Sequence, residues 1–353
     1  MGKELLRDIA FMGEYKIRVR ILEEHEYSLW DDFVCSSPQG SVFTSTDWLL
    51  ASSKYRNHSL KLFGCFDGDT LIGACPIYIQ NTHKICKTAM SNALMSPYGG
   101  MLLPNSESSK VRDVESKNHS IVNALIDEIS KNKFDTISIT NSPNLIDIRP
   151  LSRKGWKTQV LYTYSLPLLD DLLTFISKKT RNTIKKAEKN NITVDKRFDL
   201  ESFWDLTLDT YNKQNMKPPF SKQYLTEMIN VILKSNAGEM WVAELESGEI
   251  ASAEIIVWDN KRAHRWLAAS NYSLRGTGAT SLLLFEIFQD LRSKGHQEIN
   301  LMAGNTPQLS MFVTGFNPEL IPYYRLEKTI TVKGKVCLSM LNNFRRFKNK
   351  DRN

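Results

Sequence analysis

Apolar and polar positions along the chain follow one order of elements twice. Both passes predict a helix, a loop, a second helix, a hairpin, and then a helix and a strand. The hairpin pattern of residues 63–79 aligns with that of residues 242–258 without a gap. Three more pairs of segments recur in the same order: residues 28–31 with 202–205, 48–49 with 224–225, and 136–139 with 298–301. Repetition in a fixed order predicts a duplicated fold with a cleft between its halves.

The predicted elements are similar in the two halves. The first half is expected to hold helices over residues 27–34, 47–54 and 121–131, a hairpin turn at 67–69 and a strand over 135–140. Residues 83–118, rich in serine, proline and glycine, are expected to be mostly loop. A weak alternation over 161–168 predicts the strand that joins the halves. The second half is expected to hold helices over 177–190, 202–211, 222–233 and 280–294, and strands over 239–245, 250–259, 263–270 and 298–302.

This order of elements predicts an α+β protein of two tandem domains, each a mixed, mostly antiparallel sheet flanked by helices. We place the domains at residues 1–165 and 166–335, followed by a basic tail over 336–353. The 353 residues are enough for two hydrophobic cores. With 41% hydrophobic and 24% charged residues, the composition is typical of soluble globular proteins.

Composition also narrows the class of protein. The first 16 residues carry charges throughout, without the apolar centre of a signal peptide, which favours a cytosolic location. The five cysteines show no CxxC spacing, so we expect reduced thiols. No cluster of His, Cys, Asp and Glu has the spacing of metal ligands, so no metal is expected.

Positive charge is concentrated in two short segments. Residues 178–189 carry a net charge of +5 and residues 343–353 a net charge of +4. Subtracting both from the total of +7 leaves −2 for the rest of the chain. This distribution favours local anion contacts over a general nucleic-acid-binding surface. The tail, with phenylalanines among its arginines, is compatible with an anionic membrane surface or with a solvated end.

The most specific motif is a glycine-containing turn. It follows a predicted strand and opens a predicted helix, so its backbone N–H groups and the helix N-terminus favour a bound phosphate. The alternative is a tight turn without a ligand. The predicted cofactor-binding residues are Arg275, Gly276, Thr277, Gly278, Ala279 and Thr280.

Further candidates are polar or aromatic residues in apolar surroundings. Glu254 shares a face of its strand with apolar residues, which favours a raised pKa and a role as base; the alternative is an ion pair with Arg265. The first copy has Cys75 at the matching position. The predicted catalytic set is Glu254, Asn305 and Tyr323, and the predicted substrate-binding set includes Tyr98, Arg181, Lys185 and His264. The alternatives are packing for the aromatic and histidine side chains and a solvated helix face for the basic ones.

The turn resembles the acyl-donor loop of the GNAT acyltransferase superfamily, Arg/Gln-x-x-Gly-x-Gly/Ala. Arg275 and Gly278 fit this pattern, and Thr280 stands in its last position. The whole chain is similar to the Fem family of aminoacyl transferases, which are tandem GNAT-like units. The segments that carry this similarity are residues 40–45 with Trp48, 181–187, 269–279, 304–305, and Phe312 with 315–316. In one departure, Val313 stands where many relatives have a lysine.

The resemblance implies an N-acyltransferase whose second half binds the donor and whose first half is a non-catalytic acceptor side. The implied donor is acyl-CoA or aminoacyl-tRNA. The implied acceptor is a primary amine, of a cell-envelope peptide or an amino-sugar precursor. Trp48 and Phe312 are expected to contact substrate. A catalytically inactive binding protein of the same fold is the remaining alternative.

Overall fold

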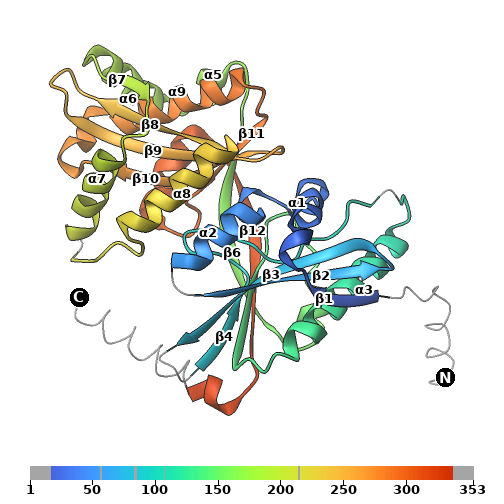
Figure 1. The fold of residues 1–353 in the computed structure, drawn as a ribbon. Coiled ribbons are helices and arrows are strands. Elements are labelled where there is room, and N and C mark those ends of the chain that lie inside the picture. Colours follow the sequence, from blue (N-terminus) through green and yellow to red (C-terminus); the bar gives the residue numbers. More distant parts are fainter. Residues whose placement is uncertain (1–16, 56–57, 83–85, 107, 214, 337–353) are drawn as a thin grey trace.

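A computed structural model describes residues 17–55, 58–82, 86–106, 108–213 and 215–336. The tail predicted over 336–353, apart from its first residue, therefore lies outside the described residues. Within them, one sheet of 12 strands runs through both halves (Figure 1).

The first half contains its elements in the predicted order, with some additions. They are β1 (Ile17–Ile21), η1 (Glu24–Glu26), α1 (Tyr27–Ser36), η2 (Val42–Thr44), α2 (Thr46–Tyr55), β2 (Ser59–Asp67), β3 (Thr70–Thr82), β4 (Cys86–Met90), α3 (Val111–Ser130), β5 (Thr136–Thr140), α4 (Arg149–Arg153) and β6 (Lys157–Pro167).

The second half repeats that order. Its elements are α5 (Leu172–Phe175), α6 (Lys178–Lys189), β7 (Thr193–Lys196), α7 (Leu200–Asn212), α8 (Lys222–Ser235), β8 (Gly238–Glu244), β9 (Ile250–Trp258), β10 (Ala263–Ser270), η3 (Tyr272–Thr277), α9 (Ala279–Ser293), β11 (Glu298–Met302), α10 (Pro307–Val313), η4 (Thr314–Phe316) and β12 (Glu319–Thr329). After α5 and α6, the second half has a strand (β7), two helices (α7 and α8) and a hairpin (β8–β9) in the order of β1, α1, α2 and β2–β3 in the first half, which confirms the duplication.

The two halves exchange their last strands. The strand order is β1-β2-β3-β4-β5-β12-β6-β11-β10-β9-β8-β7. The closing strand of the first unit, β6, is antiparallel to β11 of the second, and the closing strand of the second unit, β12, is antiparallel to β5 of the first. Between them, residues 157–165 of β6 pair with residues 319–327 of β12. Equivalent strands of the two halves therefore follow in the same order from either edge of the sheet, and the pairing of β6 with β12 joins the halves at its centre.

Three hydrophobic clusters cover the sheet. On one face a single cluster spans both halves and contains residues of α1, α2, α7 and α8. The repeat pair Trp48 and Tyr224 lies there, fully buried, where α2 contacts α8. The opposite face has separate clusters, one under α3 in the first half and one under α6 and α9 in the second.

Several elements differ from the sequence-based expectation. The described residues within 91–110 are loop, as expected for most of residues 83–118, but β4 and the first part of α3 stand at either end of that loop and were not predicted. The early part of α3 is polar or exposed, and its buried residues begin at Ile121, so the apolar spacing predicts only its second half. Strands β1, β7 and β12 and helix α10 were also not predicted. Edge strand β7 has no fully buried residue, which removes the alternation that would indicate it.

Candidate functional site

Strands β10 and β11 diverge after a short contact. Their parallel pairing joins Ala263 to Ile299 and His264 to Asn300, whereas β10 continues to Ser270. Helix α9 begins at Ala279, so its N-terminus lies toward the end of β10 where the gap between the strands opens. A gap between parallel strands beside a helix N-terminus is a common place for a ligand in sheets flanked by helices.

The predicted glycine turn stands at this helix N-terminus. Gly278 caps α9 with a φ of 89°, a conformation that favours glycine. A Cβ on Gly278 would lie 2.6 Å from the carbonyl oxygen of Thr183, so glycine also lets α6 approach the turn. Lys186 Nζ, from α6, donates to the carbonyl oxygen of Gly276 at 2.7 Å. A Cβ at Gly276 would meet nothing within 4 Å, which leaves the backbone there open.

The other residues of the turn have different roles. Thr277 Oγ1 donates to the carbonyl of Leu274 at 2.6 Å and accepts from the N–H of Ala279 at 3.3 Å. Thr280 Oγ1 donates to Ser252 Oγ at 3.2 Å. Arg275 lies over the ring of Tyr272, 4.2 Å from its centre. The two hydroxyl groups therefore hold the turn in shape, and its backbone and Arg275 face the surroundings.

Some basic side chains of helix α6 form hydrogen bonds within the protein, and others are exposed. Arg181 Nη1 donates to the carbonyl oxygens of Leu173 and Thr174 at 3.0 and 3.4 Å, and so caps α5. Lys186 holds the turn, whereas Lys178, Lys179, Lys185 and Lys189 are exposed. Arg181 is therefore occupied within the protein and Lys185 is exposed, while the residues of α6 that reach the turn are Thr183, Lys186 and Ala187.

Glu254 forms a buried ion pair. Its side chain is fully buried and accepts from Arg265 Nε at 2.8 Å, with a second contact to Nη2. Burial raises the pKa of the Glu254 carboxyl, and the charge and hydrogen bonds of Arg265 offset part of this. The structure thus contains the pairing that the sequence left as the alternative. Cys75 is fully buried under α3, in the place that corresponds to Glu254.

Asn305 and Tyr323 lie together at the centre of the sheet. Asn305 Oδ1 accepts from the N–H of Tyr162, and its Nδ2 donates to the carbonyl of Tyr162, both at 2.9 Å. The same Nδ2 donates to Tyr323 Oη at 3.2 Å. Burial raises the pKa of Tyr323, so its phenol is protonated at neutral pH. The Asn305 amide therefore extends the sheet and orients the phenol.

Phe312 and Val313 end α10. Phe312 is partly buried, with its ring 6.0 Å from the Arg265 guanidinium and 5.9 Å from Phe316. Val313 is fully buried in the cluster under α9. A lysine side chain at this position would enter an apolar core. The valine that replaces the lysine of many relatives therefore fits the packing here.

In the first half the corresponding gap is filled by its own chain. After β4, the N–H of Gly99 donates to the carbonyl of Thr140 at 3.1 Å, and Leu102 forms a bridge with Ala74 of β3. A Cβ on Gly100 would lie 2.1 Å from Asn141 Oδ1, so glycine permits this close passage. Segment 98–103 therefore forms backbone contacts where β4 and β5 diverge, whereas in the second half the pairing of β10 with β11 ends at His264 and Asn300.

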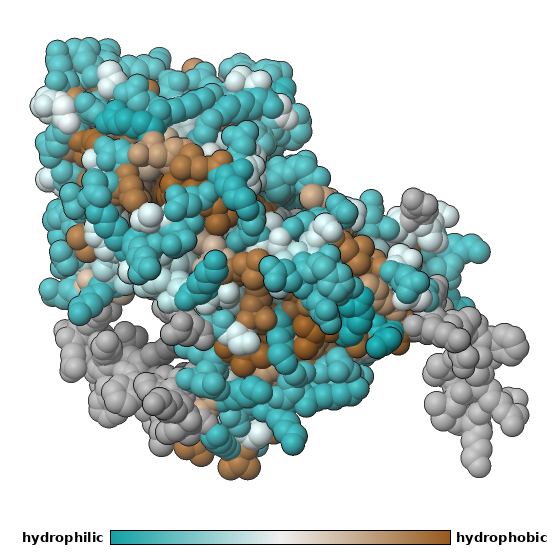
Figure 2. All heavy atoms as spheres, in the orientation of Figure 1, coloured by the Kyte–Doolittle hydropathy of each residue, from teal (hydrophilic) through white to brown (hydrophobic). Residues whose placement is uncertain are grey.

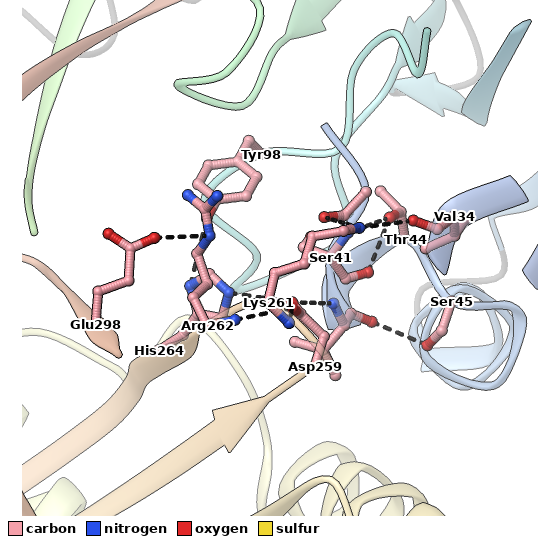
Figure 3. Close-up of polar contacts among 12 residues, drawn as sticks. Val34, Ser41, Thr44, Ser45, Tyr98, Asp259, Lys261, Arg262, His264 and Glu298 are labelled. Atoms are coloured by element: carbon pink, nitrogen blue, oxygen red, sulfur yellow. Dashed lines mark hydrogen bonds and ion pairs between the residues drawn. The ribbon is translucent and has the colours of Figure 1, made fainter. Parts of the chain in front are cut away.

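Three predicted substrate contacts are buried where the halves meet, and two of them, Tyr98 and His264, are drawn in Figure 3. Tyr98 Oη lies 3.3 Å from His264 Nδ1, and His264 Nε2 lies 3.4 Å from Asp259 Oδ2. The ring of Phe43 packs on His264 and on Trp48, at 4.9 and 5.2 Å between centres. Trp48, Tyr98 and His264 thus pack the junction in this structure.

The turn between β9 and β10 fastens the second half to the first. Lys261 Nζ donates to the carbonyls of Val34 and Gly40, at 2.9 and 3.3 Å, and so caps α1 (Figure 3). Asp259 Oδ2 accepts from the N–H of Val42 at 3.1 Å. Sequence reasoning missed both, because charged residues in a hairpin turn usually face solvent.

The comparisons with known proteins agree with this architecture. Residues 177–308 match the acetyltransferase (GNAT) domain family. The structure is similar to that of FemX (TM-score 0.70, 13% identity, 89% of this chain and 97% of that one). It is also similar to a tandem GNAT protein from the clavulanic acid pathway (0.56, 11%, 89% and 98%) and to L-PGS from Bacillus licheniformis (0.55, 12%, 91% and 96%). No protein of curated function matches the sequence.

The chain has a tandem GNAT fold. The expected Fem-like arrangement of two such units and the α+β class are thereby confirmed. The domain match in the second half also gives the enzyme class, an acyltransferase.

Two further observations concern metals and membranes. In the part of the chain that the structure describes, no group of three or more His, Cys, Asp or Glu side chains could hold a metal ion. No helix among the described residues is long and apolar enough to cross a membrane. Cys35, Cys65 and Cys75 are free thiols, and Cys337 lies outside the described residues.

The glycine turn leads to a first prediction. Gly278→Ala should lower the free energy of unfolding by about 1–3 kcal/mol, because alanine is strained at this φ and its Cβ meets Thr183. Gly276→Ala, two residues away and facing open space, should stay within about 0.5 kcal/mol of the parent. Urea unfolding measures both. Equal effects of the two changes would contradict the close approach of α6.

The junction leads to a second prediction. Burial alone would raise the pKa of Asp259, but His264 and the N–H groups of Lys261 and Val42 lower it to about 2. A lowered carboxyl pKa adds stability above the unfolded value of about 4, and this is lost as pH falls toward 2. As pH falls through that range, the free energy of unfolding of the parent should therefore decrease by roughly 2 kcal/mol more than that of Asp259→Asn.

The matched control for this measurement is Asp47→Asn. Asp47 also joins the halves, through Lys234 at 3.3 Å, but it is largely exposed. Urea unfolding between about pH 6 and pH 2 should show the steep acid dependence in the parent and in Asp47→Asn. If Asp259→Asn has the same slope as the parent, Asp259 does not carry this acid sensitivity.

Proposed function

We propose that the second half transfers an acyl group from acyl-CoA to a primary amine in the gap between β10 and β11. The first half forms the acceptor side of that reaction. The observation that carries this proposal is the difference between two equivalent gaps. In the second half the pairing of β10 with β11 ends after two residue pairs, beside a glycine turn at a helix N-terminus, whereas in the first half residues 98–103 form backbone hydrogen bonds in the equivalent place. The cytoplasmic location remains a prediction from the sequence.

The donor side of the gap fits a diphosphate. Backbone at Gly276 is open, α9 directs its positive end there, and Arg275 and Lys185 add cations. These residues would hold the phosphates of CoA. Its bound thioester supplies the activated acyl group, and the diverging strands give room for an extended arm.

The chemistry requires proton transfer at the amine. The amine must be neutral to form the new C–N bond, and the C–S bond to CoA then breaks with return of a proton to sulfur. We assign the base to Glu254, because burial raises the pKa of its carboxyl. Tyr323, oriented by Asn305, is the proposed donor to the leaving group. A bulge in the β9–β10 pairing at Arg265–Leu267 frees backbone there for the oxyanion.

A second donor is supported by different observations. The similarity to FemX and the exposed lysines of α6 are compatible with aminoacyl-tRNA, which binds through its phosphates. The acceptor amine would be the same in either case. We propose a cell-envelope peptide or an amino-sugar precursor for it.

Ligand-dependent unfolding tests the donor. Acetyl-CoA at about 100 times its dissociation constant should stabilise the folded chain by about 2.7 kcal/mol. Both Gly276→Ala and Gly278→Ala should lower this increment, because a Cβ at Gly276 stands in the space proposed for the phosphates and strain at Gly278 shifts the turn, measured as the change between free and liganded protein of each variant. If charged tRNA stabilises the chain and acetyl-CoA does not, the donor is aminoacyl-tRNA. Stabilisation by neither ligand would refute the proposed transfer.

Turnover tests the base. Glu254→Gln should lower kcat by roughly 10²–10⁴ and remove the acidic limb of the pH profile, because the amide cannot accept the proton. The change also leaves Arg265 buried without its carboxylate, which costs about 3–5 kcal/mol of stability. The double variant Glu254→Gln with Arg265→Met should recover stability but not turnover. Recovery of both would show that the pair is structural and that another group is the base.

A further inference from the structure

The segment after β12 presents apolar side chains to solvent. Ile330, Val332 and Val336 are 42%, 76% and 48% exposed. Figure 2 shows brown, apolar surface at the lower end of the molecule, where this segment lies in Figure 1. The backbone beneath is anchored, because the N–H of Ile330 donates to the carbonyl of Asp135 at 2.9 Å. Thr331 Oγ1 also donates to Asp135 Oδ1, at 2.6 Å. The apolar side chains are therefore held outward by the fold.

Several lysines lie on the segments around Asp135, the residue that anchors this segment. Lys61 and Lys87 both donate to Asn132 at 3.0 Å, and Lys328 donates to the carbonyl of Lys154 at 3.3 Å. Lys133 and Lys335 are exposed on either side of Asp135. We call the three apolar residues together with these lysines the basic tip.

The carboxylates that contact this region are matched by other lysines. Asp127 pairs with Lys154 and Glu128 with Lys131, each at 2.7 Å, and Asp135 lies 3.8 Å from Lys333. The lysines of the basic tip thus add positive charge that these carboxylates do not balance. The chain continues from Val336 through 17 more residues, whose last eleven carry a net charge of +4.

We propose that the basic tip docks on the surface of an anionic phospholipid bilayer. The exposed aliphatic side chains would enter the membrane interface, and the lysines would attract the anionic head groups. Neither the apolar contact nor the electrostatic attraction is strong enough alone. A nucleic acid would use the lysines but would leave the valines in water. A second copy of the tip would bring like charges together. The combination therefore favours a bilayer, to which residues 337–353 add charge.

Vesicle co-sedimentation of the full chain tests the proposal. The parent should bind vesicles of phosphatidylcholine mixed with phosphatidylglycerol and not phosphatidylcholine alone, and added salt should weaken binding. Val332→Asp should lower the partition coefficient at least tenfold, because it puts a like charge among the head groups. Lys335→Gln should lower it about fivefold. Lys133→Asn should do the same, with asparagine chosen because Lys133 has a φ of 54°.

Matched controls separate docking from folding. Ile146→Asp changes a side chain that is 77% exposed in a different loop, and it should bind as the parent does. All variants should keep the thermal unfolding midpoint, since the changed side chains face solvent. The proposal is overturned if the parent does not bind anionic vesicles, or if Val332→Asp binds like Ile146→Asp. It is equally overturned if the lysine variants weaken binding to RNA but not to vesicles.

Discussion

The exchange of closing strands is the constraint on which the rest of the structure depends. Strand β6 leaves the first unit to pair with β11, β12 returns to pair with β5, and the two strands pair with each other. Backbone N–H and C=O groups pair along these strands, and an unpaired buried group costs free energy. The halves therefore cannot move apart without breaking hydrogen bonds at the centre of the sheet. Asn305 reinforces this centre by extending the ladder with its amide. The junction around Asp259 and His264 can therefore be compact and largely apolar, with a few polar contacts that the strands hold in register.

The two halves share one topology but differ in the chain between the strand after the hairpin and the next helix. Both units splay the strand after the hairpin away from the following parallel strand. In the first, close passage at Gly100 lets the chain enter its own gap and finish a buried core. In the second, the positive φ of Gly278 lets α6 approach the helix N-terminus, and α9 begins directly after the turn. Glycine permits close approach in both places, and what differs is the length of chain available between the strand and the helix.

The sequence predicts what is periodic and local. The hairpins, α6, α8, α9 and the glycine turn follow from apolar spacing and turn residues near in sequence, and their bounds agree closely with those observed. The strand exchange does not follow, because β12 pairs with residues far away in the chain. The same reason hides the cap that Lys261 supplies to α1. Aromatic residues are ambiguous in another way: Trp48 and Tyr98 have the chemistry of a binding site and the size of a core, and burial at the junction is a tertiary property.

Charge placement follows a related logic. The body of the chain is nearly neutral, so the net positive charge comes from two short segments and acts locally. Much of the excess lies on α6, beside the open gap, and at the end of the chain beyond β12. Figure 1 shows α6 at the upper end of the second half and the segment after β12 at the lower end of the first. Charges separated by much more than the Debye length of about 8 Å act independently. An anion on the donor turn and an anionic surface under the basic tip would therefore not compete electrostatically.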